Sequence, residues 1–464
     1  MTILRFSDED TWQTLEHHLT SGTKERFAFA MCRAVRSPGG RLTLRVVHVT
    51  TIDDEDVDGH TDGYGIGDRA LDDVHNEAIR TGLIPVEFHN HGLGPPSFSR
   101  TDEASLGPTA AYATNVHPAG IYGAAVYAQG RVHADIWIRE SDVVVRQPFR
   151  SVAVVGDRLR VLNASPGRPE RLARQDPVLG DDGTATLNSA RVVIVGGGGT
   201  GGQAALACAY IGMQDTAVLD NDSVELTNLN RLVTAVAADI GRSKADVARD
   251  RMLAVDPDLH VTVAPAINQA GAEDLWDADL IIGCVDNDGP RDVINQIAVA
   301  TGTPYVDIAT GVDDQTAPPR IGGRVILVRP EGPCLHCLGE LDPEEVGRWA
   351  KPEDQAELDR VHGYGTAIPD PAVVHLNGIA VNAALGEIVA WIAGHRTPAQ
   401  MLDVDLTGHL AVPGAPPGTR ITPRRPAAPA ADCIACGTRR ERATHGGDGM
   451  NEGTGALRER RPVR

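Results

Sequence analysis

This chain of 464 residues contains very little lysine and has no long apolar run. The three lysines are Lys24, Lys244 and Lys351, beside forty arginines, so a retained lysine is a candidate for a position that needs a compact point charge. No apolar stretch approaches the roughly 20 residues that span a bilayer, and the acidic N-terminus lacks the apolar core of a signal peptide. We therefore expect a cytoplasmic protein that does not use a membrane as partner.

Acidic residues outnumber basic ones by 63 to 43, which gives a net charge of −20 at pH 7. An acidic balance of this size argues against nucleic acid as the main partner. The length allows two or three domains with full cores. Of the seven cysteines, four form C-x-x-C pairs, namely Cys334 with Cys337 and Cys433 with Cys436. In a cytosolic chain such pairs indicate a metal site before they indicate disulfides.

The chain divides into four segments, which together predict an α/β protein. Residues 1–150 mix helix and strand patterns, including a helix over 68–81 and a hairpin around Gln129-Gly130, so we predict an α+β domain. Residues 151–187 are expected to form a connector that carries the segment ERLARQ. In residues 188–437, strands alternate with helices as in a doubly wound, mainly parallel Rossmann-like sheet, and a long helix is expected over 372–394. Residues 438–464 are polar and rich in Gly and Arg, which predicts disorder.

A glycine-rich turn follows the β-branched run VVIV. Gly196, Gly198 and Gly201 match G-x-G-x-x-G between a strand and a helix, where glycine lets the backbone approach a phosphate at the helix N-terminus. Asp220 ends the next strand, where a carboxylate can bind ribose hydroxyls. The turn predicts a nucleotide but does not choose between NAD and ATP.

Charged residues after the turn favour ATP. Arg231, Lys244 and Asp286 follow the strands whose carboxyl ends form the ligand edge of such a sheet. Attack at a phosphate needs cations to stabilise charge and a carboxylate to hold Mg²⁺, whereas hydride transfer does not. An NAD-dependent dehydrogenase is therefore a distant alternative.

These motifs, with DNDSVELTNLNR, GRSKA and CVDNDGPR, resemble the ThiF/MoeB/HesA superfamily of ubiquitin-activating-type adenylyltransferases over about residues 168–437. The resemblance implies that AMP is attached to the C-terminal carboxylate of a ubiquitin-like or sulfur-carrier protein ending in Gly-Gly. It also implies a homodimer. The residue roles that it implies are ribose binding by Asp220, phosphate binding by Asn228, Arg231 and Lys244, Mg²⁺ coordination by Asp286 next to Asn287, and a contribution of Arg174 to the other subunit's active site.

The two cysteine pairs fit one structural zinc site, since four thiolates leave no open position on a tetrahedral ion. Such a site would clamp the C-terminal tail onto the sheet. Many relatives carry a nucleophilic cysteine in a loop where this chain has none, between Cys284 and Cys334 or between Cys337 and Cys433. We therefore predict that the chain makes an acyl-adenylate and passes it to another nucleophile.

A second metal pattern lies in the N-terminal segment. His89 and His91 share one face of a predicted strand, and Asp102 opens the next helix pattern. Two imidazoles and one carboxylate leave a zinc position open for water, which becomes acidic enough to attack a carbonyl. Ser99 can donate to the oxyanion. The pattern therefore predicts catalytic zinc.

The spacing H-x-H-x7-S-x2-D resembles the JAB/MPN (JAMM) metalloproteases over about residues 20–140. The resemblance implies cleavage of peptide or isopeptide bonds after the Gly-Gly of ubiquitin-like proteins. We expect Glu25 to accept the water proton, although alanine replaces the family's glycine after it and Gly92 replaces a proline. Glu87 shares the histidine face and is the alternative base.

The leading hypothesis joins the two halves: zinc-dependent cleavage of a carrier's C-terminal extension or conjugates, coupled to ATP- and Mg²⁺-dependent adenylation of its carboxylate. One alternative is an adenylyltransferase for a small peptide or amino acid, and another is a non-catalytic carrier-binding scaffold. The sequence leaves open the carrier's identity, the final acceptor, and the choice between precursor processing and removal of conjugates.

Overall fold

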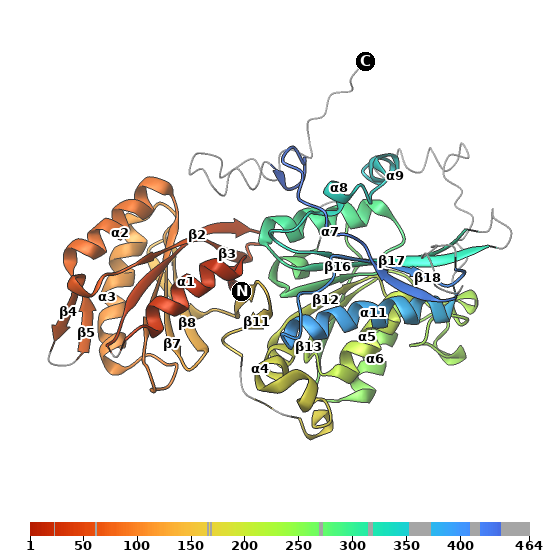
Figure 1. The fold of residues 1–464 in the computed structure, drawn as a ribbon, viewed down its shortest axis with the longest axis horizontal. Helices are drawn as coiled ribbons and strands as arrows, with labels where there is room; N and C mark the ends of the chain where they lie inside the picture. The colour runs from red at the N-terminus through yellow and green to blue at the C-terminus, as the bar shows by residue number, and fades with distance from the viewer. Residues whose placement is uncertain are drawn as a thin grey trace, which may run out of the picture.

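The computed structural model describes residues 1–437, except residues 23, 61–62, 165–166, 168, 269–271, 314–318, 352–372 and 409–417. The tail predicted to be disordered, 438–464, lies outside the described residues. The chain forms two α/β units that lie side by side along the long axis, each built on its own sheet (Figure 1). Among the described helices, none is sufficiently long and apolar to cross a bilayer, and the cytoplasmic location stays a prediction.

The N-terminal unit is a nine-stranded sheet in the order β11-β10-β1-β3-β2-β6-β7-β8-β9. Its elements are β1 (Thr2–Phe6), α1 (Glu9–Thr20), β2 (Phe27–Arg36), β3 (Leu42–Thr51), α2 (Asp68–Thr81), β6 (Ile84–Asn90), α3 (Arg100–Val116), β7 (Ile121–Ala128), β8 (Arg131–Glu140), β9 (Val143–Pro148), β10 (Ser151–Val155) and β11 (Leu159–Val161). A separate small hairpin pairs β4 (Val57–His60) with β5 (Gly63–Ile66).

Helices cover both faces of this sheet, because its strands are apolar on both sides. Trp12, Leu15 and Leu19 of α1 pack on one face, and residues of α2 and α3 such as Val74 and Ala110 pack on the other. The helix predicted over 68–81 is confirmed as α2. The predicted hairpin is also confirmed, and both turn residues, Gln129 and Gly130, have positive φ, as a two-residue turn requires.

The N-terminal unit extends beyond the boundary predicted at residue 150. The strands β10 and β11 lie in the segment expected to be a connector, yet they complete the N-terminal sheet. Ile3 of β1 pairs in parallel with Ser151 of β10. Local patterning could identify the strand but not this partner, because the pairing joins the two ends of the unit.

The C-terminal unit is an eight-stranded sheet in the order β14-β13-β12-β15-β16-β17-β18-β19. Its strands are β12 (Arg191–Val195), β13 (Asp215–Leu219), β14 (His260–Ala264), β15 (Leu280–Gly283), β16 (Tyr305–Asp313), β17 (Arg320–Val328), β18 (Met401–Asp405) and β19 (Arg420–Pro423), and its helices are α4 (Asp176–Ser189), α5 (Gly199–Ile211), α6 (Lys244–Val255), α7 (Asp288–Thr301), α8 (Leu335–Leu338), α9 (Pro343–Trp349) and α11 (Val374–Ile392).

The successive strands β14, β13, β12, β15 and β16 pair in parallel, as predicted, and β17–β19 add antiparallel strands at one edge. Helices α5, α6 and α11 cover one face, and α7 covers the other. The chain leaves β12 toward one face and the neighbouring β15 toward the opposite face. This arrangement opens a crevice at the carboxyl ends of these strands, where ligands bind in doubly wound folds.

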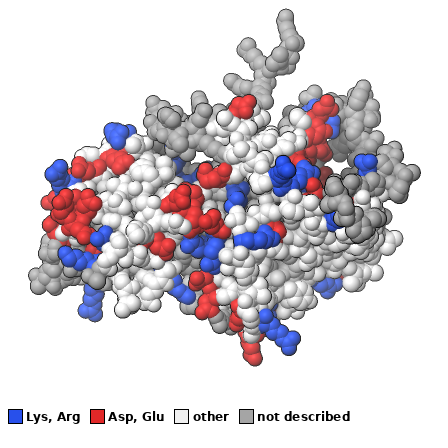
Figure 2. Space-filling view, in the orientation of Figure 1, with Lys and Arg blue, Asp and Glu red and all other residues white. Residues whose placement is uncertain are grey.

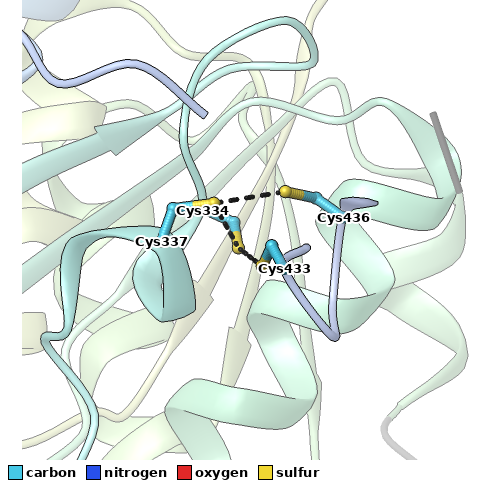
Figure 3. A group of neighbouring side chains, drawn as sticks. All are labelled: Cys334, Cys337, Cys433 and Cys436. Atoms are coloured by element: carbon cyan, nitrogen blue, oxygen red, sulfur yellow. Dashed lines mark hydrogen bonds between the residues drawn. The ribbon is translucent and has the colours of Figure 1, made fainter. Parts of the chain in front are cut away.

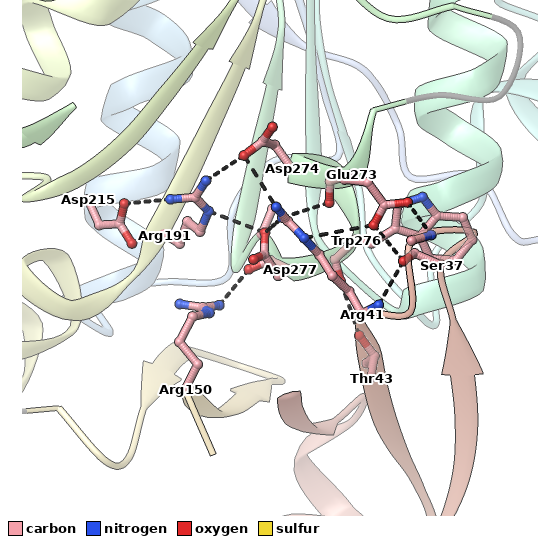
Figure 4. A network of polar contacts seen from close by, with 12 residues as sticks. Ser37, Arg41, Thr43, Arg150, Arg191, Asp215, Glu273, Asp274, Trp276 and Asp277 are labelled. Carbon is pink, nitrogen blue, oxygen red and sulfur yellow. Dashed lines mark hydrogen bonds and ion pairs between the residues drawn. The ribbon is translucent and has the colours of Figure 1, made fainter. Parts of the chain in front are cut away.

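A charged interface joins the two units at the opposite edge, where β12 and β15 begin (Figure 4). Arg5 of β1 is fully buried, donates to the carbonyl oxygens of Thr301 and Ala278, and lies 3.6 Å from Asp279.

Arg41, from the turn between β2 and β3, lies 2.6 Å from Asp277. Further contacts come from Ser37 and Gly39 to Glu273, and from Arg150 to Asp279. Buried charges are tolerated only when paired, so this network holds the units in one arrangement.

Candidate functional site

The glycine-rich turn leaves β12 at the crevice. Gly196 has a φ of 93°, and a Cβ there would lie 2.7 Å from the Cys284 carbonyl oxygen. Gly198 caps α5 without a side chain, so the first N–H groups of this helix are not occupied by a capping group. A helix N-terminus with free N–H groups is a binding site for phosphate.

Asp220 connects this turn to the end of β13. Its Oδ2 accepts a hydrogen bond from Gly197 N–H at 2.6 Å, and its Oδ1 accepts one from Asp222 N–H at 2.7 Å. Burial raises the pKa of this carboxyl above its ordinary value. The carboxylate predicted to bind ribose therefore lies directly beside the glycine-rich backbone.

Two of the predicted cations lie next to the same turn. A Cβ on Gly199 would lie 3.1 Å from Cγ of Arg231, whose guanidinium donates to the Thr227 carbonyl oxygen at 3.0 Å. Lys244 begins α6, and its Nζ lies 2.7 Å from Oδ2 of Asp222. Arg231 therefore lies against the start of α5, and Lys244 lies beside Asp222, whose N–H donates to Asp220.

The three other residues predicted to bind the nucleotide, Asn228, Asn287 and Asp286, differ in burial and in hydrogen bonding. Asn228 is 8% exposed, and its Oδ1 accepts from Glu225 N–H at 3.1 Å, so it closes a short helical turn, η3 (Leu226–Asn228). Asn287 caps α7, accepting from Gly289 N–H and donating to Glu345. Asp286 is exposed in the loop after β15, with no hydrogen bond or ion pair to another described residue.

Arg174 lies apart from this group. It follows a single turn, η2 (Glu170–Leu172), is exposed, and has no polar partner among the described residues. The neighbouring Arg171 instead ties the segment to the C-terminal unit through Asp256, at 2.8 Å. A single chain does not test the prediction that Arg174 acts in another subunit.

Sequence reasoning missed Asn377. This residue lies in α11, is 2% exposed, and its Nδ2 lies 2.6 Å from the position of a Cβ on Gly199. Its Oδ1 accepts from the Thr310 hydroxyl at 3.0 Å. The helix contains two amides, Asn377 and Asn382, and only the structure shows that Asn377 is the buried one.

The N-terminal unit brings the predicted metal residues together. One ligand atom from each of Glu25, His89, His91 and Asp102 lies within 4.8 Å of the others. The two histidine Nε2 atoms are 3.2 Å apart, and Asp102 Oδ2 lies 3.5 Å from the Nε2 of His89 and 3.3 Å from that of His91. These donors fit a tetrahedral zinc ion with one open position.

Neighbouring groups orient these side chains. The Nδ1 of His91 lies 3.3 Å from the Pro95 carbonyl oxygen, which leaves its Nε2 free for an ion. Ser99 is the N-cap of α3: its N–H donates to Asp102 Oδ2 at 2.5 Å, and its Oγ accepts from Asp102 N–H at 3.2 Å. Ser99 thereby fixes the carboxylate, in addition to its predicted role as a donor.

The two candidate bases lie on different sides of His89. Glu25 Oε1 is 3.9 Å from His89 Nε2, on the side of the cluster, and burial raises the pKa of Glu25. Glu87 Oε1 is instead 4.0 Å from His89 Nδ1, on the far side of the ring. Of the two, Glu25 is the carboxylate that can contact a water on the ion.

Acidic side chains gather on the surface at this end of the molecule (Figure 2). In the N-terminal unit, Asp53, Asp54 and Glu55 precede β4 and are exposed. Asp54 accepts from Arg26, next to Glu25. An acidic surface of this kind repels nucleic acid, in agreement with the negative net charge of the chain.

The four paired cysteines converge on one point (Figure 3). The Sγ of Cys334 lies 3.8 Å from that of Cys337 and 3.6 Å from that of Cys433, and the Sγ atoms of Cys337 and Cys436 are 3.3 Å apart. Four sulfurs at about 2.3 Å from a tetrahedral zinc would lie about 3.8 Å apart, while disulfide sulfurs lie about 2 Å apart. The spacing therefore fits a metal and not disulfides.

The environment acts differently on the individual thiols, because burial raises the pKa of Cys334 to about 11 and also raises the pKa of Cys436. Burial opposes ionisation of Cys433, but hydrogen bonds from the backbone N–H groups of Cys436 and Ala435, and from neighbouring thiols, lower its pKa to about 6. Zinc requires such thiolates. His336, inside the first pair, has its Nε2 2.6 Å from Asp292.

The remaining cysteines have inert surroundings. Cys32 and Cys208 are fully buried, and burial raises the pKa of Cys208 to about 12. Burial likewise raises the pKa of Cys284, next to the glycine-rich turn. A reactive cysteine needs a lowered pKa and access, so none of the three is a suitable nucleophile.

Comparison with known proteins agrees with the fold of the C-terminal unit. The model of the ThiF family matches residues 171–412. The chain is 39% identical over 132 residues to a probable adenylyltransferase/sulfurtransferase MoeZ of Mycobacterium tuberculosis strain CDC 1551, covering 28% of this chain and 34% of MoeZ. It is 32% identical over 175 residues to the sulfur carrier protein ThiS adenylyltransferase of Escherichia coli K12, covering 36% of this chain and 66% of that enzyme.

A solved structure of E. coli MccB with MccA-N7isoASN aligns at 20% identity and a TM-score of 0.43, over 58% of this chain and 75% of that one. The chain spans about a third of the length of MoeZ and of the Aspergillus relatives named uba4. The family model nevertheless covers more than half of the present chain, including the glycine-rich turn, Asp220, Arg231 and Lys244. This chain belongs to the ThiF family.

Proposed function

We propose that the C-terminal unit uses ATP to adenylate the C-terminal carboxylate of a ubiquitin-like or sulfur-carrier protein ending in Gly-Gly. The observation that carries the proposal is the grouping of the glycine-rich turn, Asp220, Arg231 and Lys244 at the start of α5. The ThiF family match and the names of two relatives as adenylyltransferases support it.

The chemistry follows from this grouping. An oxygen of the carrier carboxylate attacks the α-phosphorus of ATP, the bond to the bridging oxygen breaks, and pyrophosphate leaves. Arg231 and Lys244 stabilise the negative charge on the phosphates, while Asp220 binds the ribose. Asp286 would hold Mg²⁺, because this exposed carboxylate follows β15 at the edge of the sheet where ligands bind. Mg²⁺ would neutralise charge on the leaving pyrophosphate.

The acyl-adenylate is then passed to a nucleophile outside this chain. The three unpaired cysteines are buried or have a raised pKa, which supports this part of the proposal. We also propose a homodimer in which Arg174 contacts the partner's nucleotide, because its side chain is exposed in the single chain.

We further propose that the N-terminal unit is a JAB/MPN-like zinc hydrolase that cleaves the carrier after Gly-Gly. His89, His91 and Asp102 would hold the ion, which would supply an acidic, nucleophilic water. Glu25 would accept the water proton, and Ser99 would donate to the oxyanion. The convergence of Glu25 with three metal donors from distant parts of the chain supports the proposal. The four-cysteine cluster would hold a second, structural zinc.

ATP–pyrophosphate exchange tests the first proposal, with recombinant ThiS and other Gly-Gly carriers as probes. Exchange should require a carrier with a free Gly-Gly carboxylate. Exchange with an isolated tripeptide at the same rate would favour a small-molecule substrate. No ATP binding at all would leave only a scaffold role.

Cleavage tests the second proposal, using the same carriers extended by two residues and the zinc-loaded chain. Mass spectrometry should find the mature carrier, and Glu25→Gln should abolish cleavage while both zinc ions remain bound. Cleavage that persists after chelation of the N-terminal metal would reject the zinc hydrolase.

A further inference from the structure

One ring nitrogen of His89 is buried and lacks a hydrogen-bond partner among the described residues. The side chain is 2% exposed, and its Nε2 points to His91 and Asp102. Its Nδ1, on the opposite side of the ring, is the orphaned atom. A buried imidazole N–H without a partner is costly, so the group nearest to Nδ1 is important.

Glu87 is the nearest acceptor. Its Oε1 lies 4.0 Å from His89 Nδ1, so a small movement of either side chain would close a hydrogen bond. The two residues are neighbours on one face of β6, because side chains alternate along a strand. Glu87 is only 9% exposed, so solvent does not compete for this carboxylate.

A tyrosine holds Glu87 in place. The hydroxyl of Tyr122, on the adjacent strand β7, donates to Glu87 Oε2 at 2.5 Å. Tyr122 is fully buried, and its ring contacts Trp137 and His75. With Oε2 bonded to this fixed hydroxyl, Oε1 is the oxygen left to face His89.

We propose that Glu87 is a positioning residue for the metal site: it accepts the Nδ1–H of His89 and so presents the Nε2 lone pair to the ion. The inference rests on the proposed N-terminal metal site. A carboxylate in this position fixes the tautomer and makes the imidazole a stronger ligand. His91 has a neutral acceptor in the same position, the Pro95 carbonyl oxygen. The two histidines are thus oriented by different groups, and Glu87 makes His89 the stronger ligand.

If Glu87 has this role, it takes no direct part in the proposed cleavage reaction. The ring nitrogens of an imidazole point in different directions, so a carboxylate near Nδ1 cannot contact a water on an ion at Nε2. Glu87 acts through His89, while Glu25 remains the group on the reacting side.

Metal titration tests the inference in the full-length chain, without any carrier. The probe is Co²⁺, because only cysteine thiolates give it an intense near-ultraviolet band, which separates the cysteine cluster from the N-terminal site. We expect Glu87→Ala to weaken Co²⁺ binding at the N-terminal site about 10- to 100-fold. Glu87→Gln, which keeps an acceptor without the charge, and Tyr122→Phe should show smaller losses.

The matched control is Asp135→Asn. Asp135 is also buried in this sheet, but it pairs with Arg146 at 2.6 Å. Its substitution should leave Co²⁺ affinity unchanged, and circular dichroism should confirm folding of each variant. Wild-type affinity in folded Glu87→Gln and Tyr122→Phe would overturn the positioning role even if Glu87→Ala does not fold. Failure of the wild-type chain to bind Co²⁺ at this site would instead reject the metal site itself, and the inference with it.

Discussion

A Cβ atom on Gly201 would lie 1.7 Å from the carbonyl oxygen of Gly196. The first turn of α5 therefore packs directly on the backbone that ends β12, and no side chain fits between them. This contact places the helix N-terminus at the crevice. It also gives Gly201 a different role from Gly198, although the two glycines look alike in the sequence motif.

Gly201→Ala should both destabilise the protein and abolish nucleotide binding, because the backbone must move to admit the methyl group. Gly198→Ala should leave stability near wild type, since a Cβ there meets open space, but should weaken ATP binding by about tenfold or more, because the methyl group occupies the approach to the phosphates. Thermal unfolding and calorimetric titration with an ATP analogue measure the two effects. Equal losses of stability in both variants would contradict this distinction.

Arg231→Ala and Lys244→Ala should each reduce ATP–pyrophosphate exchange by roughly 10²- to 10³-fold, because each removes a cation from the phosphate site. Arg249→Ala is the matched control: Arg249 lies on the same helix as Lys244 but pairs with Asp246 at 2.7 Å. Its exchange rate should stay within about twofold of wild type. Equal rates in all three variants would reject the proposed phosphate site.

Cys337→Ser should remove one zinc ion and loosen the segment that carries Cys433 and Cys436. Structural zinc contributes several kcal/mol to folding, so we expect a fall in Tm of roughly 10 °C. Limited proteolysis should then cut near residues 418–437. His336→Gln is the control, because its Nε2 faces Asp292 and not the sulfurs, and it should retain the zinc. Unchanged zinc content in Cys337→Ser would contradict a four-sulfur site.

Acid should destabilise the N-terminal unit through a buried histidine pair. His75 Nδ1 lies 2.8 Å from His117 Nε2, and burial lowers the pKa of His75 to about 4. The unfolded chain takes up this proton near pH 6.5, so stability is complete above that pH and falls by up to about 3 kcal/mol as the pH drops toward 4.

Urea unfolding at pH values between 4 and 7 measures this slope. His75→Phe should flatten it, because an apolar ring cannot bind the proton. Substitution of the exposed His395 by Gln should not alter it. An equally steep acid loss in His75→Phe would assign the effect to other groups.

Local sequence patterns predicted several of the elements that carry the two candidate sites. The helix over 68–81, the glycine-rich turn and the paired cysteines each depend on residues that are close in the chain. The strand from Ile84 to Asn90 likewise places His89 and His91 on one face by alternation alone. Such features are encoded in spacing, so they could be read before any partner was known.

What escaped prediction depends on contacts between distant segments. Asn377 reaches the glycine-rich turn only because α11 packs on α5, and β10 joins the N-terminal sheet only through β1. The alternation that placed Glu87 on the histidine face could not show which nitrogen of His89 it would face. That choice follows from Tyr122 on a different strand.

The charged interface between the units has a consequence for the carrier. From that interface β2 extends over 10 residues, or about 30 Å, to Phe27 beside His89, while β12 leads the other way to Gly196 (Figure 1). An extended tail would need about nine residues to span β2 alone, and more to reach Gly196. A carrier with a shorter flexible tail could thus not occupy both centres of a single chain at once. If both proposals hold, the trimmed carrier leaves into solvent and must bind again before its carboxylate is adenylated. Any carrier that already ends in Gly-Gly then competes with it for the adenylation site on equal terms.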